Sequence, residues 1–166
     1  MPTSTYDLIA SNVLGSSAAS VTFSSIPATY RDLVLVTQYL STSTNTYAIL
    51  RFNSDSGSNY QHVYMSGSSG STYSGSGSFT GVLSVYWTAA NSTGPVLGIY
   101  HIMDSSATDK HKTVLSRTNT DNTSRNGVEA FANRWANTAA ITQIDVVGGN
   151  NNFAAGSSFH LYGISA

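Results

Sequence analysis

Leu33-Val-Leu-Val-Thr-Gln-Tyr-Leu40 and Tyr47-Ala-Ile-Leu-Arg-Phe-Asn53 are two short runs rich in β-branched and aromatic residues, separated by Ser, Thr and Asn. In the second run, one face carries Ala48, Leu50 and Phe52, and the other carries Tyr47, Ile49 and Arg51. This period of two is typical of a β-strand. Residues 33–36 are apolar on both faces, which predicts a central strand that is covered on both sides.

Similar runs recur along the whole chain, between clusters of Ser, Gly, Asn and Asp. Strands are expected at 6–10, 20–24, 33–40, 47–53, 60–65, 80–88, 96–103, 112–118, 128–134, 141–147 and 158–164. Many short strands with few helix signals predict an all-β fold, an antiparallel β-sandwich of jelly-roll type. Residues 66–78 are almost entirely Ser and Gly, so we expect a flexible loop within one domain over residues 1–166.

The composition is unusual for its low charge. Apolar residues make up 40% of the 166 residues, enough for a core, but charged residues make up only 9% and the net charge is −1. Such a surface suits a protein that packs against neighbouring subunits, where charges would be desolvated. The alternative is a protein that works outside a cell at varying salt concentration.

Several classes of function are disfavoured. Seven scattered Lys and Arg residues form no basic run, so no nucleic-acid binding is expected. No apolar stretch is long enough to cross a bilayer, and the first twelve residues do not have the pattern of a secretory signal. The chain contains no cysteine, which excludes disulfides and zinc–thiolate sites.

No enzymatic motif is present in the sequence. Gly-x-Ser-x-Gly, a Walker loop and His-Glu-x-x-His are all absent. The eight acids are scattered mostly at strand ends, where they favour turns. The histidines lack metal-ligand spacing and are expected at surfaces or interfaces: His62, His101, His111 and His160. We therefore expect no enzyme and no cofactor.

One loop carries oxygen ligands at nearby positions. Asn53, Asp55 and Asn59 are candidates for a weak calcium site, although a closing glutamate is missing. The favoured alternative is an Asx-rich hairpin turn between two strands.

Aromatic residues are the other candidate contact groups. The chain has ten tyrosines and two tryptophans, and such side chains suit interfaces and also stack on sugar rings. Half or more of them are expected in the core or on sheet faces. The candidates for an interface or a glycan site are Tyr73, Tyr86, Trp87 and Trp135.

The whole chain resembles a family of small structural proteins of tailed phages, notably phages of aquatic bacteria and cyanobacteria. The residues that carry the resemblance include Tyr6-Asp-Leu-Ile-Ala-Ser-Asn12, Arg51-Phe-Asn53 with Asp55-Ser-Gly-Ser-Asn-Tyr60, Lys112-Thr-Val-Leu-Ser-Arg117, Phe153-Ala-Ala-Gly-Ser157 and Leu161-Tyr-Gly-Ile164. The resemblance implies a β-sandwich building block of a phage particle, made in the host cytoplasm and located on the particle surface. It implies no catalytic residues and does not fix the position in the particle.

Three functions are compatible with these features. The first is a capsid decoration, or cement, protein that binds the major capsid protein on the outside of the head, expected as a homotrimer. The second is a tail or fibre appendage that contacts tail proteins and binds a host glycan. The third, a depolymerase, is opposed by the scarcity of acids.

Overall fold

The computed structural model describes residues 5–43, 47–68, 70–83, 85, 94–120 and 127–164, and these form an all-β structure without a helix. Every strand pair within them is antiparallel. The strands are β1 (Tyr6–Val13), β2 (Ser20–Phe23), β3 (Asp32–Tyr39), β4 (Ala48–Phe52), β5 (Tyr60–Ser68), β6 (Ser71–Phe79), β7 (Val82–Leu83), β8 (Val96–Met103), β9 (Lys112–Thr120), β10 (Gly127–Trp135), β11 (Ile144–Gly148) and β12 (Ser158–Ile164).

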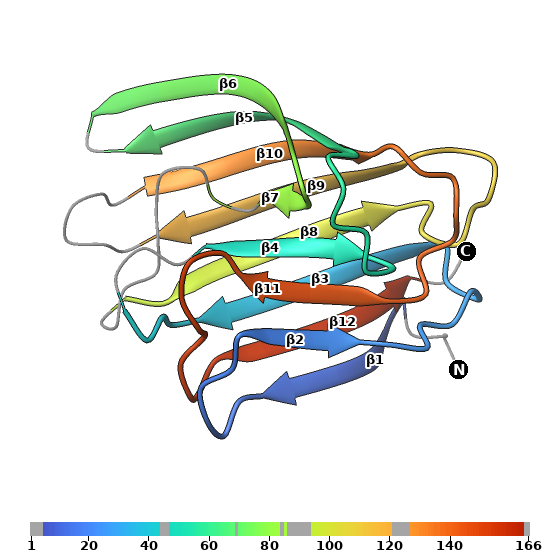
Figure 1. Ribbon diagram of the computed structural model, residues 1–166, viewed down its shortest axis with the longest axis horizontal. Coiled ribbons are helices and arrows are strands. Elements are labelled where there is room, and N and C mark those ends of the chain that lie inside the picture. Colours follow the sequence, from blue (N-terminus) through green and yellow to red (C-terminus); the bar gives the residue numbers. More distant parts are fainter. Residues whose placement is uncertain are drawn as a thin grey trace.

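The strands form two sheets that face each other (Figure 1). The large sheet has eight strands in the order β1-β12-β3-β8-β9-β10-β5-β6, and the small sheet has four in the order β2-β11-β4-β7. In Figure 1, β5 and β6 extend past the small sheet at the top of the view. The expected antiparallel sandwich is therefore present, while jelly-roll connectivity stays a prediction.

The large sheet has an inner face toward the small sheet and an outer face away from it. Side chains alternate between the two faces, as in β8, where Val96, Tyr100 and Ile102 are fully buried inside. The core between the sheets is strongly aromatic. Trp135 lies 5.5 Å from Phe52 between ring centroids, and Phe153 lies 5.2 Å from Tyr39 and 5.1 Å from Phe159.

Tyrosine hydroxyl groups complete the hydrogen bonds of β4. This strand pairs with β7 only at Ile49 and Leu50. The amide of Ala48 donates to the hydroxyl of Tyr39 at 3.1 Å, and the amide of Phe52 donates to that of Tyr60 at 3.0 Å. Both tyrosines belong to the large sheet, so these bonds also fix the two sheets relative to each other.

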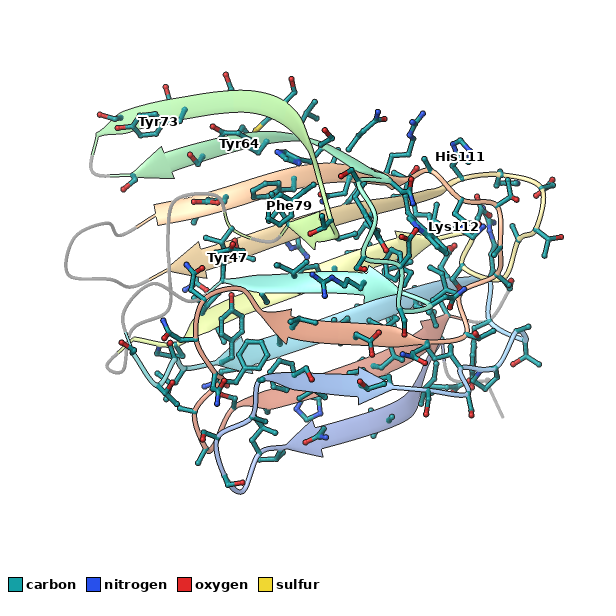
Figure 2. The ribbon with its side chains drawn as sticks, in the orientation of Figure 1. Tyr47, Tyr64, Tyr73, Phe79, His111 and Lys112 are labelled. Atoms are coloured by element: carbon teal, nitrogen blue, oxygen red, sulfur yellow. The ribbon has the colours of Figure 1, made fainter. Side chains whose placement is uncertain are left out.

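The expectation of a flexible loop at 66–78 is wrong. Residues 60–68 and 71–79 form the β5–β6 hairpin with nine consecutive residue pairs. The physical reason lies in Gly75 and Gly77 of β6, which pair with Tyr64 and His62 of β5. Figure 2 labels Tyr64 on β5, and Tyr73 and Phe79 on β6. A Cβ atom at Gly75 would lie 2.8 Å from the Tyr64 ring, so the aromatic ring covers the glycine and occupies the space of a side chain.

Other boundaries differ in smaller ways. The strand expected at 80–88 is represented by β7 at Val82–Leu83, and most of the remainder lies outside the described residues. β3 is central, with Leu33 and Leu35 fully buried inside, but no layer covers its outer face in the described part of the chain. Val34 on that face is nevertheless buried, and Val36 is half-buried.

Within the residues described, no helix is long and apolar enough to span a bilayer.

Candidate functional site

The outer face of the large sheet is the most distinctive surface of the molecule. The register of β8, β9, β10, β5 and β6 builds it from rows of side chains that cross the strands. One row runs through Ile99, Arg117, Ala130, Met65 and Ser74. Because the Cβ atoms of cross-strand neighbours lie about 4.5–5.5 Å apart, the side chains of this row are neighbours on one surface.

The next row runs through Leu97, Asn119, Val128, Gly67 and Thr72. A Cβ atom at Gly67 would meet nothing within 4 Å, so this glycine leaves open space at the surface. Asn119 accepts a hydrogen bond from the amide of Leu97 at 3.2 Å, which holds its side chain against the sheet.

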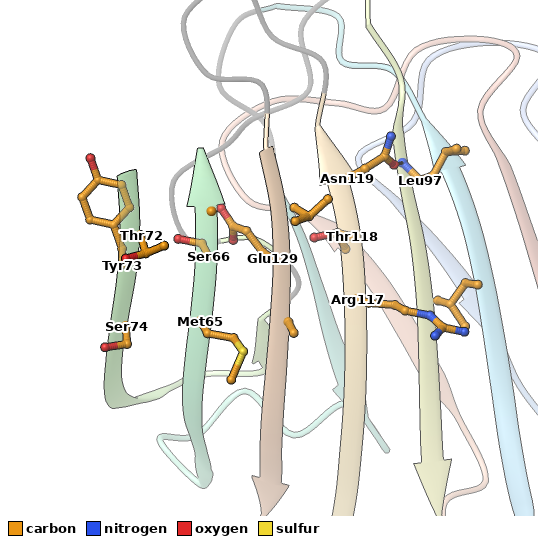
Figure 3. Close-up of a pocket in the computed structure, with 14 residues that line it drawn as sticks. Met65, Ser66, Thr72, Tyr73, Ser74, Leu97, Arg117, Thr118, Asn119 and Glu129 are labelled. Atoms are coloured by element: carbon orange, nitrogen blue, oxygen red, sulfur yellow. Dashed lines mark hydrogen bonds between the residues drawn. The ribbon is translucent and has the colours of Figure 1, made fainter. Parts of the chain in front are cut away.

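Together the two rows line a groove of about 780 Å³ (Figure 3). Its aliphatic side chains are widely exposed, 68% for Met65, 65% for Val128 and 47% for Leu97. Arg117 is the cation among the residues that line it. A hollow of about 570 Å³ continues along the same face past Leu115 and Met103. Large exposed aliphatic side chains that cluster in this way are typical of a surface that contacts another molecule.

Of the four expected aromatic contact residues, the structure describes Tyr73 and Trp135, and these two do not lie in one site. Tyr73 lies on β6 and is 42% exposed, but its side chain is on the inner side of the sheet, opposite to the groove. Trp135 is completely buried between the sheets, so its assignment as an interface or glycan residue is wrong. The physical reason is its position at the inner face of β10, where it stacks on Tyr60 at 6.2 Å. Tyr86 and Trp87 lie outside the described residues.

In the oxygen-rich loop 53–59, the side-chain oxygens of Asn53 and Asp55 accept hydrogen bonds from other groups of the protein and do not form an open cation site. Asn53 Oδ1 accepts from the amides of Thr142 at 2.9 Å and Gln143 at 3.1 Å. Asp55 accepts from Gly57 N at 2.9 Å, from Asn59 Nδ2 at 3.0 Å and from Trp135 Nε1 at 2.8 Å.

Burial tends to raise the pKa of Asp55, but the hydrogen bonds from Trp135, Gly57 and Asn59 together hold it below the ordinary 3.8. The arrangement favours the turn over calcium binding. The loop is not a hairpin, however, because it joins β4 of the small sheet to β5 of the large one. No group of three or more His, Asp or Glu side chains suited to a metal occurs among the residues described.

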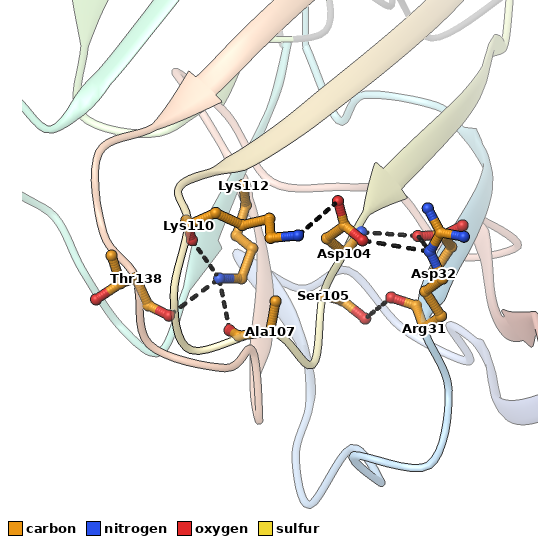
Figure 4. Close-up of polar contacts among 8 residues, drawn as sticks. All are labelled: Arg31, Asp32, Asp104, Ser105, Ala107, Lys110, Lys112 and Thr138. Atoms are coloured by element: carbon orange, nitrogen blue, oxygen red, sulfur yellow. Dashed lines mark hydrogen bonds and ion pairs between the residues drawn. The ribbon is translucent and has the colours of Figure 1, made fainter. Parts of the chain in front are cut away.

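Lys112 is a buried cation that the sequence does not reveal. Its side chain begins at the inner face of β9 and is fully buried. Figure 4 shows its Nζ donating to the carbonyl oxygens of Ala107 at 2.8 Å, Lys110 at 2.9 Å and Thr138 at 3.1 Å. Burial lowers the pKa of Lys112, and the nearby carboxylates of Asp109 and Asp104 act in the opposite direction. The ammonium group thus joins two connections at one end of the sandwich, a structural role.

The histidines occupy different environments. His62 is buried on the inner face of β5, 6.0 Å from the Phe131 ring, so its expected position at a surface is wrong. Burial lowers the pKa of His62 below 6.5. His111 is exposed beside Lys112 (Figure 2), while His101 and His160 are half-buried on the outer face.

Comparisons with known proteins give no relatives: no family model matches the chain, and neither a curated protein nor a solved structure matches it.

Proposed function

We propose that the protein is a non-enzymatic structural component of a bacteriophage particle, and that it decorates the capsid by binding the major capsid protein through the groove on its outer face. The observation that carries the proposal is the exposed aliphatic surface of Met65, Leu97 and Val128 across neighbouring strands. The placement in a phage particle rests on the resemblance of the chain, from Tyr6 to Ile164, to phage structural proteins.

A protein partner fits this surface better than a small polar ligand. Burying exposed aliphatic side chains removes apolar area from water, which favours association before the entropy cost of binding is counted. The aliphatic rows contain one charged side chain, Arg117, whose long apolar stem can be covered while its head stays hydrated. Little charge therefore has to be desolvated when another protein packs here.

The virion surface suits the low charge of the whole chain. With 9% charged residues and a net charge of −1, the protein resists association weakly in solution. A protein that functions while bound in many copies to a capsid does not need a strongly charged surface to stay soluble. The same property supports repeated contacts that reinforce neighbouring capsid subunits.

A glycan-binding tail appendage is the second candidate. Tyr73 on the edge strand β6 is exposed, but its side chain lies on the inner side of the sheet, whereas Thr72, Ser74 and Asn119 supply polar groups on the outer side, in the groove. Sugar stacking requires an aromatic ring face, and the exposed floor of the groove is aliphatic. This candidate therefore has narrower support than protein binding.

The location is tested on purified particles of the encoding phage. Antibody labelling viewed by electron microscopy should show the protein distributed over the head. Label confined to the tail would contradict capsid decoration and support the tail-appendage function. Absence of the protein from particles would overturn both functions.

The surface is tested by adding the protein back to particles stripped of it. Val128→Glu places a charge in the groove, and we expect binding at least about tenfold weaker than for the unmodified protein. Val13→Glu is the matched control, because Val13 is 63% exposed on β1, far from the groove. Equal binding by the two variants would show that the groove is not the contact surface.

A further inference from the structure

The outermost strand of the large sheet, β6, has the features of a strand that pairs with another chain. It has nine residues, Ser71–Phe79, with no charge and no proline. Eight of the nine are exposed, and the pairing with β5 continues without a bulge. Every second residue of an edge strand directs its backbone N–H and C=O groups away from the sheet. These groups form a template for a further strand.

The other sheet edges are protected. β1, at the opposite edge of the large sheet, is interrupted by an irregularity between Leu8 and Ala10 and carries Asp7. In the small sheet, the edge strands β2 and β7 have only four and two residues. Charges, bulges and short length are the usual ways in which proteins prevent edge pairing. Of the four edges in the described residues, β6 alone lacks all three.

We propose that two copies of the protein pair through β6 in an antiparallel manner, about a two-fold axis at Gly75. This arrangement joins the two large sheets into one continuous sheet. In this register, Ser74 of one copy lies opposite Ser76 of the other, and Tyr73 lies opposite Gly77.

The sequence of β6 is self-complementary in this register. An uncharged strand has no like charges to bring together across the axis. Each residue lies opposite one that is an even number of positions away in the sequence, such as 74 opposite 76. Residues whose backbone N–H and C=O groups point away from β5 therefore face residues of the same kind in the other copy. Tyr73 faces a residue without a side chain, which repeats between copies the arrangement of Tyr64 over Gly75 within one copy.

The faces of the sheet are preserved by such an axis. Tyr73, Gly75 and Gly77 lie on the inner side, where Tyr64 and His62 already cover the glycines. Ser74 and Ser76 lie on the outer side, next to Met65 and Val63. The outer faces of the two copies therefore continue across the junction, and the two grooves lie on the same side of the joined sheet.

The test is the mass of the purified full chain by sedimentation equilibrium, which does not involve any particle. We expect a monomer–dimer equilibrium. In Ser74→Lys/Ser76→Lys, lysines oppose lysines across the axis at two places, and self-association should weaken by about tenfold. In Ser74→Lys/Ser76→Glu, each lysine opposes a glutamate of the other copy, and dimerisation should be restored.

Ser16→Lys/Ser17→Lys is the charge-matched control, because both serines are exposed in the connection between β1 and β2. It should dimerise like the unmodified protein, and near-ultraviolet circular dichroism should show that all variants are folded. A monomeric or trimeric unmodified protein would overturn the proposal. So would a Lys/Lys variant that dimerises normally, or a Lys/Glu variant that fails to recover.

Discussion

Nε1 of Trp135 donates a hydrogen bond of 2.8 Å to Oδ2 of Asp55. The bond joins the last residue of β10 to the loop that crosses from the small sheet to the large one. The same carboxylate also accepts from Gly57 and Asn59. One side chain thus closes a loop and satisfies a buried indole.

Asp55→Asn should destabilise the protein by about 1–3 kcal/mol in urea unfolding, because charge-assisted hydrogen bonds are replaced by weaker neutral ones. The pKa of Asp55 is lower in the folded chain than the ordinary 3.8. Its contribution is therefore present above pH 3.8 and is lost as the pH falls through the folded pKa. The variant should show a shallower loss of stability in acid, whereas Asp109→Asn, at an exposed site, should follow the unmodified protein.

Lys112→Met should destabilise the protein by about 2–4 kcal/mol, because three backbone carbonyls lose a charged donor in a buried place. Urea unfolding measures the change. Lys110→Met is the control, since its side chain is 51% exposed and makes only a 4.0 Å ion pair with Asp104. A similar small loss in both variants would contradict the structural role of Lys112.

His62→Gln should change how stability depends on pH. Burial lowers the pKa of His62 below 6.5, so the unfolded chain binds the proton more readily than the folded one. Stability from this residue is present above pH 6.5 and is lost as the pH falls through the folded pKa. Melting temperatures measured from neutral to mildly acidic pH should fall less steeply for His62→Gln than for His111→Gln, which alters an exposed histidine.

Gly163→Ala should destabilise the protein by about 1–3 kcal/mol, because the added methyl group would clash with the ring of Tyr30 and would displace it. Gly15→Ala is the matched control, because a Cβ atom there meets nothing within 4 Å. Thermal unfolding of the two variants gives the comparison. Equal melting temperatures would show that Tyr30 moves without cost.

Most strands could be predicted because their inner and outer faces differ in polarity. The boundaries of β8 and β12 were predicted correctly, since β8 is a continuous, mostly apolar run between turn signals and β12 alternates buried apolar residues with more polar ones. β6 was not predicted because Ser and Gly dominate it. The pattern that could have indicated this strand is Tyr73, Gly75, Gly77 and Phe79 at alternate positions. Its two glycines are covered by side chains of β5, so the strand itself shows few apolar residues.

The site was harder to predict than the strands. The groove depends on the register between β8, β9, β10 and β5, and the pairing of β10 with β5 joins strands that are far apart in the sequence. The burial of Trp135 and Lys112 also depends on which face of a strand meets the small sheet. A lysine is expected at the surface from its residue type alone. Lys112 is buried because carbonyl oxygens from two connections, which are far apart in the sequence, surround its ammonium group.

The strand order also determines when folding can take place. β12 lies between β1 and β3 in the large sheet, and β11 lies between β2 and β4 in the small one. The early strands of both sheets therefore wait for the last two strands to be synthesised. Until β11 and β12 have left the ribosome, these early strands lack one of their partners, so the sandwich closes late and with the slow kinetics of long-range pairing.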